Sequence, residues 1–171
     1  MIQRIQSLWL ALVVVLCVAA FFFPLAIFQF PVKDFTTDAI YKLLPIGTQP
    51  YQSDPAWTAL IFNCIVLVVG FITIFMYKNR IIQLKILSFA FLACVVEVAL
   101  LFFYQIDAGL TAAVTSMYKG TPAEIKPTVD AAKTAYGVAS YFPIAEVIFF
   151  ILARNAIRKD EIRVRNSERL R

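Results

Sequence analysis

Two carboxylates stand inside otherwise apolar stretches of this chain. Glu97 lies in ILSFAFLACVVEVALLFFY and Glu146 lies in SYFPIAEVIFF, and neither stretch contains Lys or Arg. A charged acid is costly in an apolar medium, so acids in such stretches usually face the interior of a helix bundle or a cavity. Because desolvation penalises the charged form, we expect neutral carboxyl groups that can donate hydrogen bonds.

The helical rise of about 1.5 Å per residue places Glu97 and Glu146 about one turn apart in height. A neighbouring apolar stretch presents Ala59, Asn63 and Gly70 at helical spacing, which makes Asn63 the nearest candidate partner for Glu97. Three interpretations stay open: hydrogen-bonded structural acids, a contact for a basic group on a partner's helix, and a proton or cation relay. The structural interpretation is favoured, because polar pairs inside membranes contribute under about 1 kcal/mol each.

The rest of the composition argues against familiar reaction centres. The chain has no histidine, which excludes histidine-ligated haem, the H-E-x-x-H metalloprotease and the Ser-His-Asp triad. Cys17, Cys64 and Cys94 form no C-x-x-C pair and are interpreted as small buried hydrophobes. The loop acids show no paired spacing, although acids alone could serve as general acid and base. We therefore expect no catalytic residue, no metal site and no cofactor.

The elements that must position these acids are membrane-spanning helices. The apolar content of 61% exceeds that of soluble domains, and the mean hydropathy is +0.77. A span needs roughly 20 apolar residues. The predicted spans are 8–28, 57–77, 86–106 and 135–153. The expected fold is an all-α integral membrane protein, an up-down-up-down four-helix transmembrane bundle, with Pro24 and Pro143 as possible kinks in the first and fourth spans.

The distribution of charge predicts the threading of the chain. The N-terminus, the 78–85 turn and the tail at 154–171 carry eleven of the sixteen Lys and Arg residues and three acids. The two longer loops carry five basic and six acidic residues. Because cytoplasmic segments are enriched in Lys and Arg, both termini are predicted to be cytoplasmic and both longer loops external.

The two external loops differ in their sequence patterns. The loop at 29–56 contains four prolines and several aromatics, which favours a folded external cap, with a mere connector equally open. After the third span, good helix formers continue to about residue 119, and Gly120 to Pro122 supply a stop. A second helix is expected to begin near Pro127, so that spans 3 and 4 project from the membrane as a helical hairpin.

The C-terminal stretch at 154–171 is strongly basic. Such a juxtamembrane segment attracts anionic lipid headgroups, at about 1 kcal/mol per basic residue. A cytoplasmic protein partner is the alternative, and no nucleic-acid partner is expected because no aromatic residue interleaves the charges. The basic residues are Arg154, Arg158, Lys159, Arg163, Arg165, Arg169 and Arg171.

The two ends, MIQRIQSLWL and AIRKDEIRVRNSERLR, resemble a family of small four-helix inner-membrane proteins of unknown function in Bacteroidota. That family typically opens with MIQRIQ and closes with a motif like AIRKDE-x-x-VRS-x-x-RLR, and here Asn166 replaces the serine. The resemblance implies a bacterial inner-membrane location and no particular activity. The matching residues are Ile2, Gln3, Arg4, Ile5 and Gln6 at the start, and Ala156, Ile157, Arg158, Lys159, Asp160, Glu161, Val164, Arg165, Arg169, Leu170 and Arg171 at the end.

These matching residues lie at the predicted cytoplasmic ends of the first and fourth spans. One hypothesis is that Gln3, Arg4 and Gln6 meet the basic tail in a joint cytoplasmic surface. The leading functional interpretation is a non-catalytic accessory or scaffold subunit of an inner-membrane complex, with a membrane protein as its partner. The runner-up is a small proton-coupled carrier or lipid-binding membrane protein that uses Glu97 and Glu146.

Overall fold

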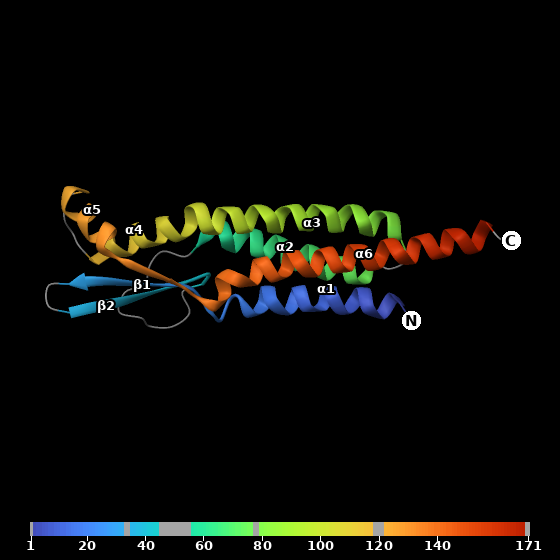
Figure 1. Ribbon diagram of the computed structural model, residues 1–171, viewed down its shortest axis with the longest axis horizontal. Coiled ribbons are helices and arrows are strands. Elements are labelled where there is room, and N and C mark those ends of the chain that lie inside the picture. The colour runs from blue at the N-terminus through green and yellow to red at the C-terminus, as the bar shows by residue number, and fades with distance from the viewer. Residues whose placement is uncertain (1, 33–34, 45–55, 77–78, 118–121, 170–171) are drawn as a thin grey trace.

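Four long helices lie side by side in the computed structural model, which describes residues 2–32, 35–44, 56–76, 79–117 and 122–169. They are α1 (Ile2–Ala19), α2 (Trp57–Phe75), α3 (Arg80–Leu100) and α6 (Phe142–Arg169). Helix α1 packs against α2 and α6, and α3 packs against the same two helices (Figure 1). We call α1, α2, α3 and α6 the helix group. Both ends of the chain lie at one end of this group, where α6 extends past its neighbours.

Three helical stretches are long and apolar enough to cross a membrane by length and composition. They are Trp57–Phe75, Ile81–Ser116 and Val138–Arg163, and the apolar part of α1, Ile5–Ala19, is shorter. These helices make the structure compatible with a membrane protein. The expected helical span at 8–28 is wrong at its C-terminal end, because α1 stops at Ala19 and residues 24–28 belong to a strand.

The all-α expectation is also wrong, because a three-stranded antiparallel sheet stands at the other end of the helix group. Its strands are β1 (Pro24–Val32), β2 (Phe35–Lys42) and β3 (Lys133–Tyr136), in the order β2-β1-β3. Phe28 and Phe30 of the central strand are buried and the intervening Gln29 is exposed, which is the alternation of a strand. The start of β1 could not be predicted from the sequence, because a short apolar run is equally compatible with a helix and with a strand.

The chain that leaves α3 stays helical well beyond the expected span. It passes through a π-helical segment, η1 (Leu101–Gln105), into α4 (Ile106–Met117). Of the expected turn at residues 119–125, residues 119–121 lie outside the described residues, and residues 122–125 are helical instead of forming a turn. The returning chain does not form the helix that was expected from Pro127 through 153. It forms α5 (Pro122–Ala131), β3 and a 3-10 turn, η2 (Val138–Tyr141), because residues 133–136 pair with β1.

Neither of the two prolines expected to kink a span lies in the interior of an α-helix. Pro24 begins strand β1, after α1 has already ended. Pro143 is the second residue of α6, where a missing backbone N–H removes no helical hydrogen bond. Pro143 thus lies where η2 changes to α6, inside the candidate span Val138–Arg163.

We call β1, β2, β3, α4 and α5 the sheet cap. Its core consists of buried side chains from the sheet and from the helical rod that α3 begins, with Phe28, Phe30, Tyr41, Leu101 and Ile106 among them. Polar side chains also join it to the helix group. The Tyr41 hydroxyl donates a hydrogen bond to Gln105 Oε1 at 3.0 Å, and Gln105 Nε2 donates to Thr58 Oγ1 at the start of α2. The predicted cap segment at 29–56 is thus partly a β-hairpin, and residues 45–55 lie outside the described part.

Candidate functional site

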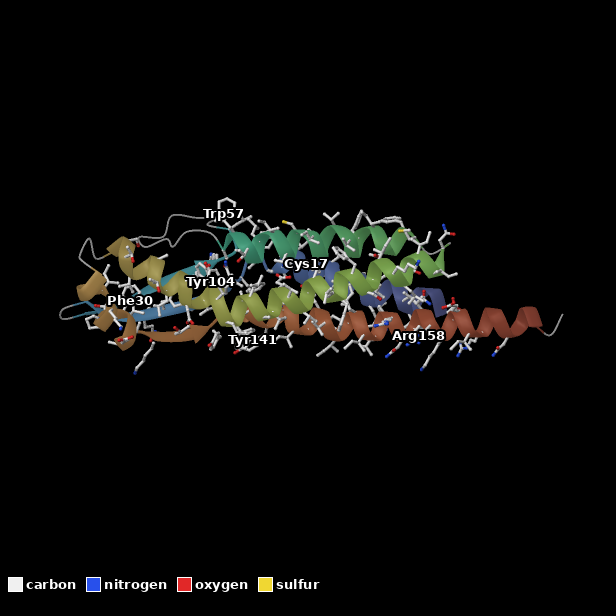
Figure 2. All side chains as sticks on the ribbon, turned by 90° about the horizontal axis from the view of Figure 1, so that it is seen from above. Cys17, Phe30, Trp57, Tyr104, Tyr141 and Arg158 are labelled. Atoms are coloured by element: carbon white, nitrogen blue, oxygen red, sulfur yellow. The ribbon has the colours of Figure 1, made fainter. Side chains whose placement is uncertain are left out.

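A buried polar centre lies inside the helix group. It consists of Cys17 on α1, Cys94 and Glu97 on α3, and Glu146 on α6. Glu97 is 2% exposed and the other three side chains are 0% exposed. Figure 2 places Cys17 within the helix group, in the half nearer to the sheet, as expected for a residue two positions before the end of α1. Both acids that the sequence singled out therefore face the interior, and two cysteines accompany them.

Glu146 receives thiol contacts from two neighbouring helices. Cys17 Sγ donates to Glu146 Oε1 at 3.3 Å. Cys94 Sγ lies 3.2 Å from the Pro143 carbonyl oxygen and 3.8 Å from Glu146 Oε2. The carboxylate of α6 thus joins α1 and α3 through weak sulfur hydrogen bonds.

Local helical geometry explains how Glu97 joins the centre. Cys94 and Glu97 are three residues apart on α3, so their side chains point to the same face of the helix. Each of three residues offers one ligand atom, and these atoms lie within 4.8 Å of one another; the residues are Cys94, Glu97 and Glu146. Thiolate sulfur and carboxylate oxygen are both common ligands of transition-metal ions, so these three residues could hold a metal.

The expected hydrogen bond between Asn63 and Glu97 does not form. Within the described part of the chain, Asn63 Oδ1, Asn63 Nδ2 and Glu97 Oε2 are buried and have no hydrogen-bond partner. A buried polar atom without a partner costs about 1–3 kcal/mol, so each such atom needs an explanation. The side chains of Asn63 and Glu97 therefore have buried polar atoms that remain able to accept or donate a hydrogen bond, and the Glu97 oxygen could also bind a metal ion.

Helix register places Asn63 close in height to the centre. Gln83 Nε2 donates to the Thr73 carbonyl oxygen at 3.1 Å, which fixes the pairing of the antiparallel helices α2 and α3. Asn63 precedes Thr73 by as many residues as Ala93 follows Gln83, so Asn63 lies at the height of Ala93 and the adjacent Cys94. Its side chain is 0% exposed and points into the helix group.

The surroundings of the centre supply no positive charge. The helical stretches 5–19, 57–75, 86–117 and 138–153 contain no Lys or Arg. Two ionised carboxylates in this interior would repel each other without compensation, because charges interact strongly where the dielectric is low. The centre can carry ionised carboxylates only if a bound cation balances their charge, and otherwise it must keep its protons.

The cytoplasmic surface predicted from the two matching ends is only partly described. Gln6 is buried, at 5% exposure, and its Nε2 donates to the Ala156 carbonyl oxygen at 3.3 Å. Gln6 therefore packs α1 against α6 and does not belong to an exposed surface. Arg154, Arg158, Lys159 and Arg163 are exposed, and Figure 2 shows Arg158 directed away from the helices. The side chains of Gln3, Arg4, Arg165, Arg169 and Arg171 lie outside the described part.

Sequence reasoning missed Cys17 and Cys94 as members of the centre. Their interpretation as small buried hydrophobes is right about burial and silent about their contacts, and the same interpretation is wrong for Cys64, which is exposed on α2. A signal was present for Cys94, since it precedes Glu97 by one helical turn. No comparable signal pointed to Cys17, because its contact with Glu146 joins residues 129 positions apart.

The fold and this centre define a small, mostly helical protein with candidate membrane spans and a sheet at one end. Residues 2–170 match the family described as a domain of unknown function (DUF4293), so the chain belongs to that family. No curated protein and no solved structure matches the chain.

Proposed function

We propose that the protein is a non-catalytic accessory or scaffold subunit of a bacterial inner-membrane complex. The observation that carries this proposal is that ordered structure projects from both ends of the helix group. The sheet cap stands at one end, and the basic part of α6 extends past its neighbours at the other (Figure 1). A protein built this way can hold partners on both sides of a membrane while its own helices fill the bilayer.

Exposed aromatic side chains support the placement in a membrane. Trp57, Tyr104 and Tyr141 are 61%, 59% and 53% exposed. Figure 2 shows all three at a similar level, where the helix group meets the sheet cap. Tyr and Trp gather at membrane interfaces. From Tyr141 to Arg158 the helical rise is about 26 Å, close to a hydrocarbon thickness of about 30 Å.

We also propose that α1 is the fourth spanning helix. Its 18 residues rise about 27 Å, which is close to a hydrocarbon thickness of about 30 Å. It packs along α2 and α6, whose apolar stretches qualify as spans. With four spans and basic residues at the ends of α1 and α6, the positive-inside rule puts both termini in the cytoplasm.

The basic part of α6 is the proposed cytoplasmic docking surface. Arg158, Lys159 and Arg163 are exposed there, so they are available to anionic lipid headgroups and to an acidic surface on a membrane-protein partner. Nucleic acid is not a proposed partner.

The test compares two variants of the tail in the native membrane. The triple substitution Arg158→Gln, Lys159→Gln and Arg163→Gln removes exposed charge, and the remaining basic residues of the tail preserve the topology signal. The matched control replaces the exposed Asn155 and Asn166 by Gln. We expect the triple variant to insert normally and to lose a partner that the control retains in mild-detergent extracts. Equal partner recovery from both variants would contradict the assigned docking surface.

A second candidate, a small proton-coupled carrier or lipid-binding protein, is favoured by the unpartnered Glu97 Oε2 alone. A carrier needs water access to this carboxyl at some stage of its cycle. A hydrophilic carbodiimide would then modify Glu97, and proton flux in liposomes would fall in Glu97→Gln and Glu146→Gln. No modification and no change in flux would remove this candidate.

A further inference from the structure

The buried centre combines features that hydrogen bonding within the protein leaves unexplained. The Cys17 thiol donates to Glu146, yet Glu97 Oε2 and both amide atoms of Asn63 lack partners within the described residues. If the acids served only to hold the helices together, Glu97 would be expected to hydrogen-bond to Asn63 or to a backbone carbonyl. One oxygen of its carboxyl group instead lies within 4.8 Å of the ligand atoms of Cys94 and Glu146. This arrangement points to a missing occupant.

We infer that the centre binds a divalent transition-metal ion of the zinc class. Cys94, Glu97 and Glu146 supply the first ligands, and Cys17 is the candidate for the fourth. The inference goes beyond the proposed function, which assigns no metal. It rests on four side chains from three helices and on the unpartnered, buried carboxylate oxygen of Glu97.

The distances are of the scale that such an ion requires. Zinc bonds of about 2.0–2.3 Å in a tetrahedron place neighbouring ligand atoms about 3.5 Å apart. The Cys17 Sγ to Glu146 Oε1 and Cys94 Sγ to Glu146 Oε2 distances are 3.3 and 3.8 Å. The three ligand atoms of Cys94, Glu97 and Glu146 lie within 4.8 Å of one another, so they must draw closer when the ion binds.

The donor set selects the class of ion. Sulfur is a poor ligand for Mg²⁺ and Ca²⁺, which prefer oxygen, whereas zinc and its neighbours accept sulfur and oxygen together. Metal ligands bind in their deprotonated form, so the ion displaces the protons of Cys94, Glu97 and Glu146. Its two positive charges offset most of the negative charge that these ligands then carry, in helical stretches that contain no Lys or Arg.

Asn63 is assigned a supporting position and not a ligand position. It lies at the height of Cys94 on the buried face of α2, where its amide can donate to a ligand carboxylate or hold an ordered water. Outer hydrogen bonds of this kind orient the ligands of a metal and tune its affinity.

The test uses Co²⁺ as a spectroscopic probe on the full chain, purified in detergent, reduced and stripped with a chelator. Thiolate ligation of Co²⁺ gives a sulfur-to-metal charge-transfer band, and a tetrahedral site gives intense visible bands. We expect saturation at one Co²⁺ per chain, displacement by Zn²⁺ and no displacement by excess Mg²⁺. Absence of the charge-transfer band, or displacement by Mg²⁺, would overturn the inference.

Three single-residue variants locate the site. Cys64 is exposed on α2, so Cys64→Ser is the matched control and leaves Cys17 and Cys94 as the chain's remaining thiols. A band that persists in Cys64→Ser therefore comes from the buried centre, and loss of the band in this variant would overturn the assignment. Cys94→Ser and Glu97→Gln are expected to weaken Co²⁺ binding at least about tenfold. If Cys94→Ser fails to fold, the Cys64→Ser spectrum still decides.

Discussion

The sheet cap and the buried centre of the helix group treat polar side chains in opposite ways. Where the sheet cap joins the helix group, Tyr41 donates to Gln105, which in turn donates to Thr58, so these three polar side chains are partnered. In the helix group, Asn63 and Glu97 keep unpartnered buried atoms within the described part of the chain. A hydrogen-bond network in which every polar group has a partner stabilises one structure. A buried polar atom without a partner costs free energy unless a bound ligand or water supplies that partner. The comparison separates a structural region from a candidate site.

The largest effect should come from emptying the core of the sheet cap. Phe28 is 0% exposed, and Phe28→Ala is expected to lower the free energy of unfolding by about 3–5 kcal/mol. The control, Phe103→Ala, removes a ring that is 86% exposed and should change it by less than about 0.5 kcal/mol. Limited proteolysis and thermal unfolding would measure both. Equal behaviour of the two variants would contradict the assigned core.

The next effect concerns the close approach of Gly137 to β1. A Cβ at Gly137 would lie 2.1 Å from the Pro24 carbonyl oxygen, so Gly137→Ala must shift backbone and should cost about 1–3 kcal/mol. At Gly70 the added Cβ would meet Val14 Cγ2 at 3.7 Å, an ordinary contact. Gly70→Ala should be neutral or up to about 1 kcal/mol stabilising, because Ala favours a helix. Denaturant unfolding would measure the free energy of unfolding of both variants, and a larger loss for Gly70→Ala than for Gly137→Ala would contradict this prediction.

A smaller loss is expected when the polar chain of the sheet cap is cut. Tyr41→Phe leaves Gln105 Oε1 without its donor, and should lower the free energy of unfolding by about 1–2 kcal/mol. Tyr136 is 50% exposed, so Tyr136→Phe is the matched control and should fall within about 0.5 kcal/mol of the parent. No difference between the two would mean that the Tyr41 hydroxyl bond is not structural.

The smallest effect is expected for Asn63, whose amide atoms lack partners in the helix group. Asn63→Leu removes two unpartnered polar atoms from the helix group, so the metal-free protein should lie within about 1 kcal/mol of the parent or be more stable. Its neighbour one turn away, the buried Val66, provides the control, since Val66→Ala leaves a cavity and should destabilise. Marked destabilisation by Asn63→Leu, measured by thermal unfolding, would show that the amide already has a structural partner.

The helices that are long and apolar enough to span a membrane could be predicted from the sequence because their signal is local. A long apolar run is sufficient evidence for a helix of membrane length, and Trp57–Phe75 lies where such a run was found. The sheet was missed for the same reason that the helices were found. Residues 24–28 are as apolar as the run that precedes them, and pairing between β1 and β3 joins positions more than a hundred residues apart. Only the tertiary partner tells this strand from a helix.

The candidate site shows the same limit. Glu97 and Glu146 stood out because an acid in an apolar run needs an explanation, and both are buried in the interior. Cys17 and Cys94 did not stand out, because a buried thiol is ordinary among apolar residues. Asn63 was named as the partner of Glu97 on helical spacing alone, yet height does not fix which way a side chain is turned.

The proposal of an accessory subunit is tested most directly by the mass of the native particle. The full chain would be extracted from its own membranes in mild detergent, and the mass and composition of the particle measured without crosslinking. The account predicts a reproducible, stoichiometric partner that remains bound through purification. A particle that contains only copies of this chain would contradict the account.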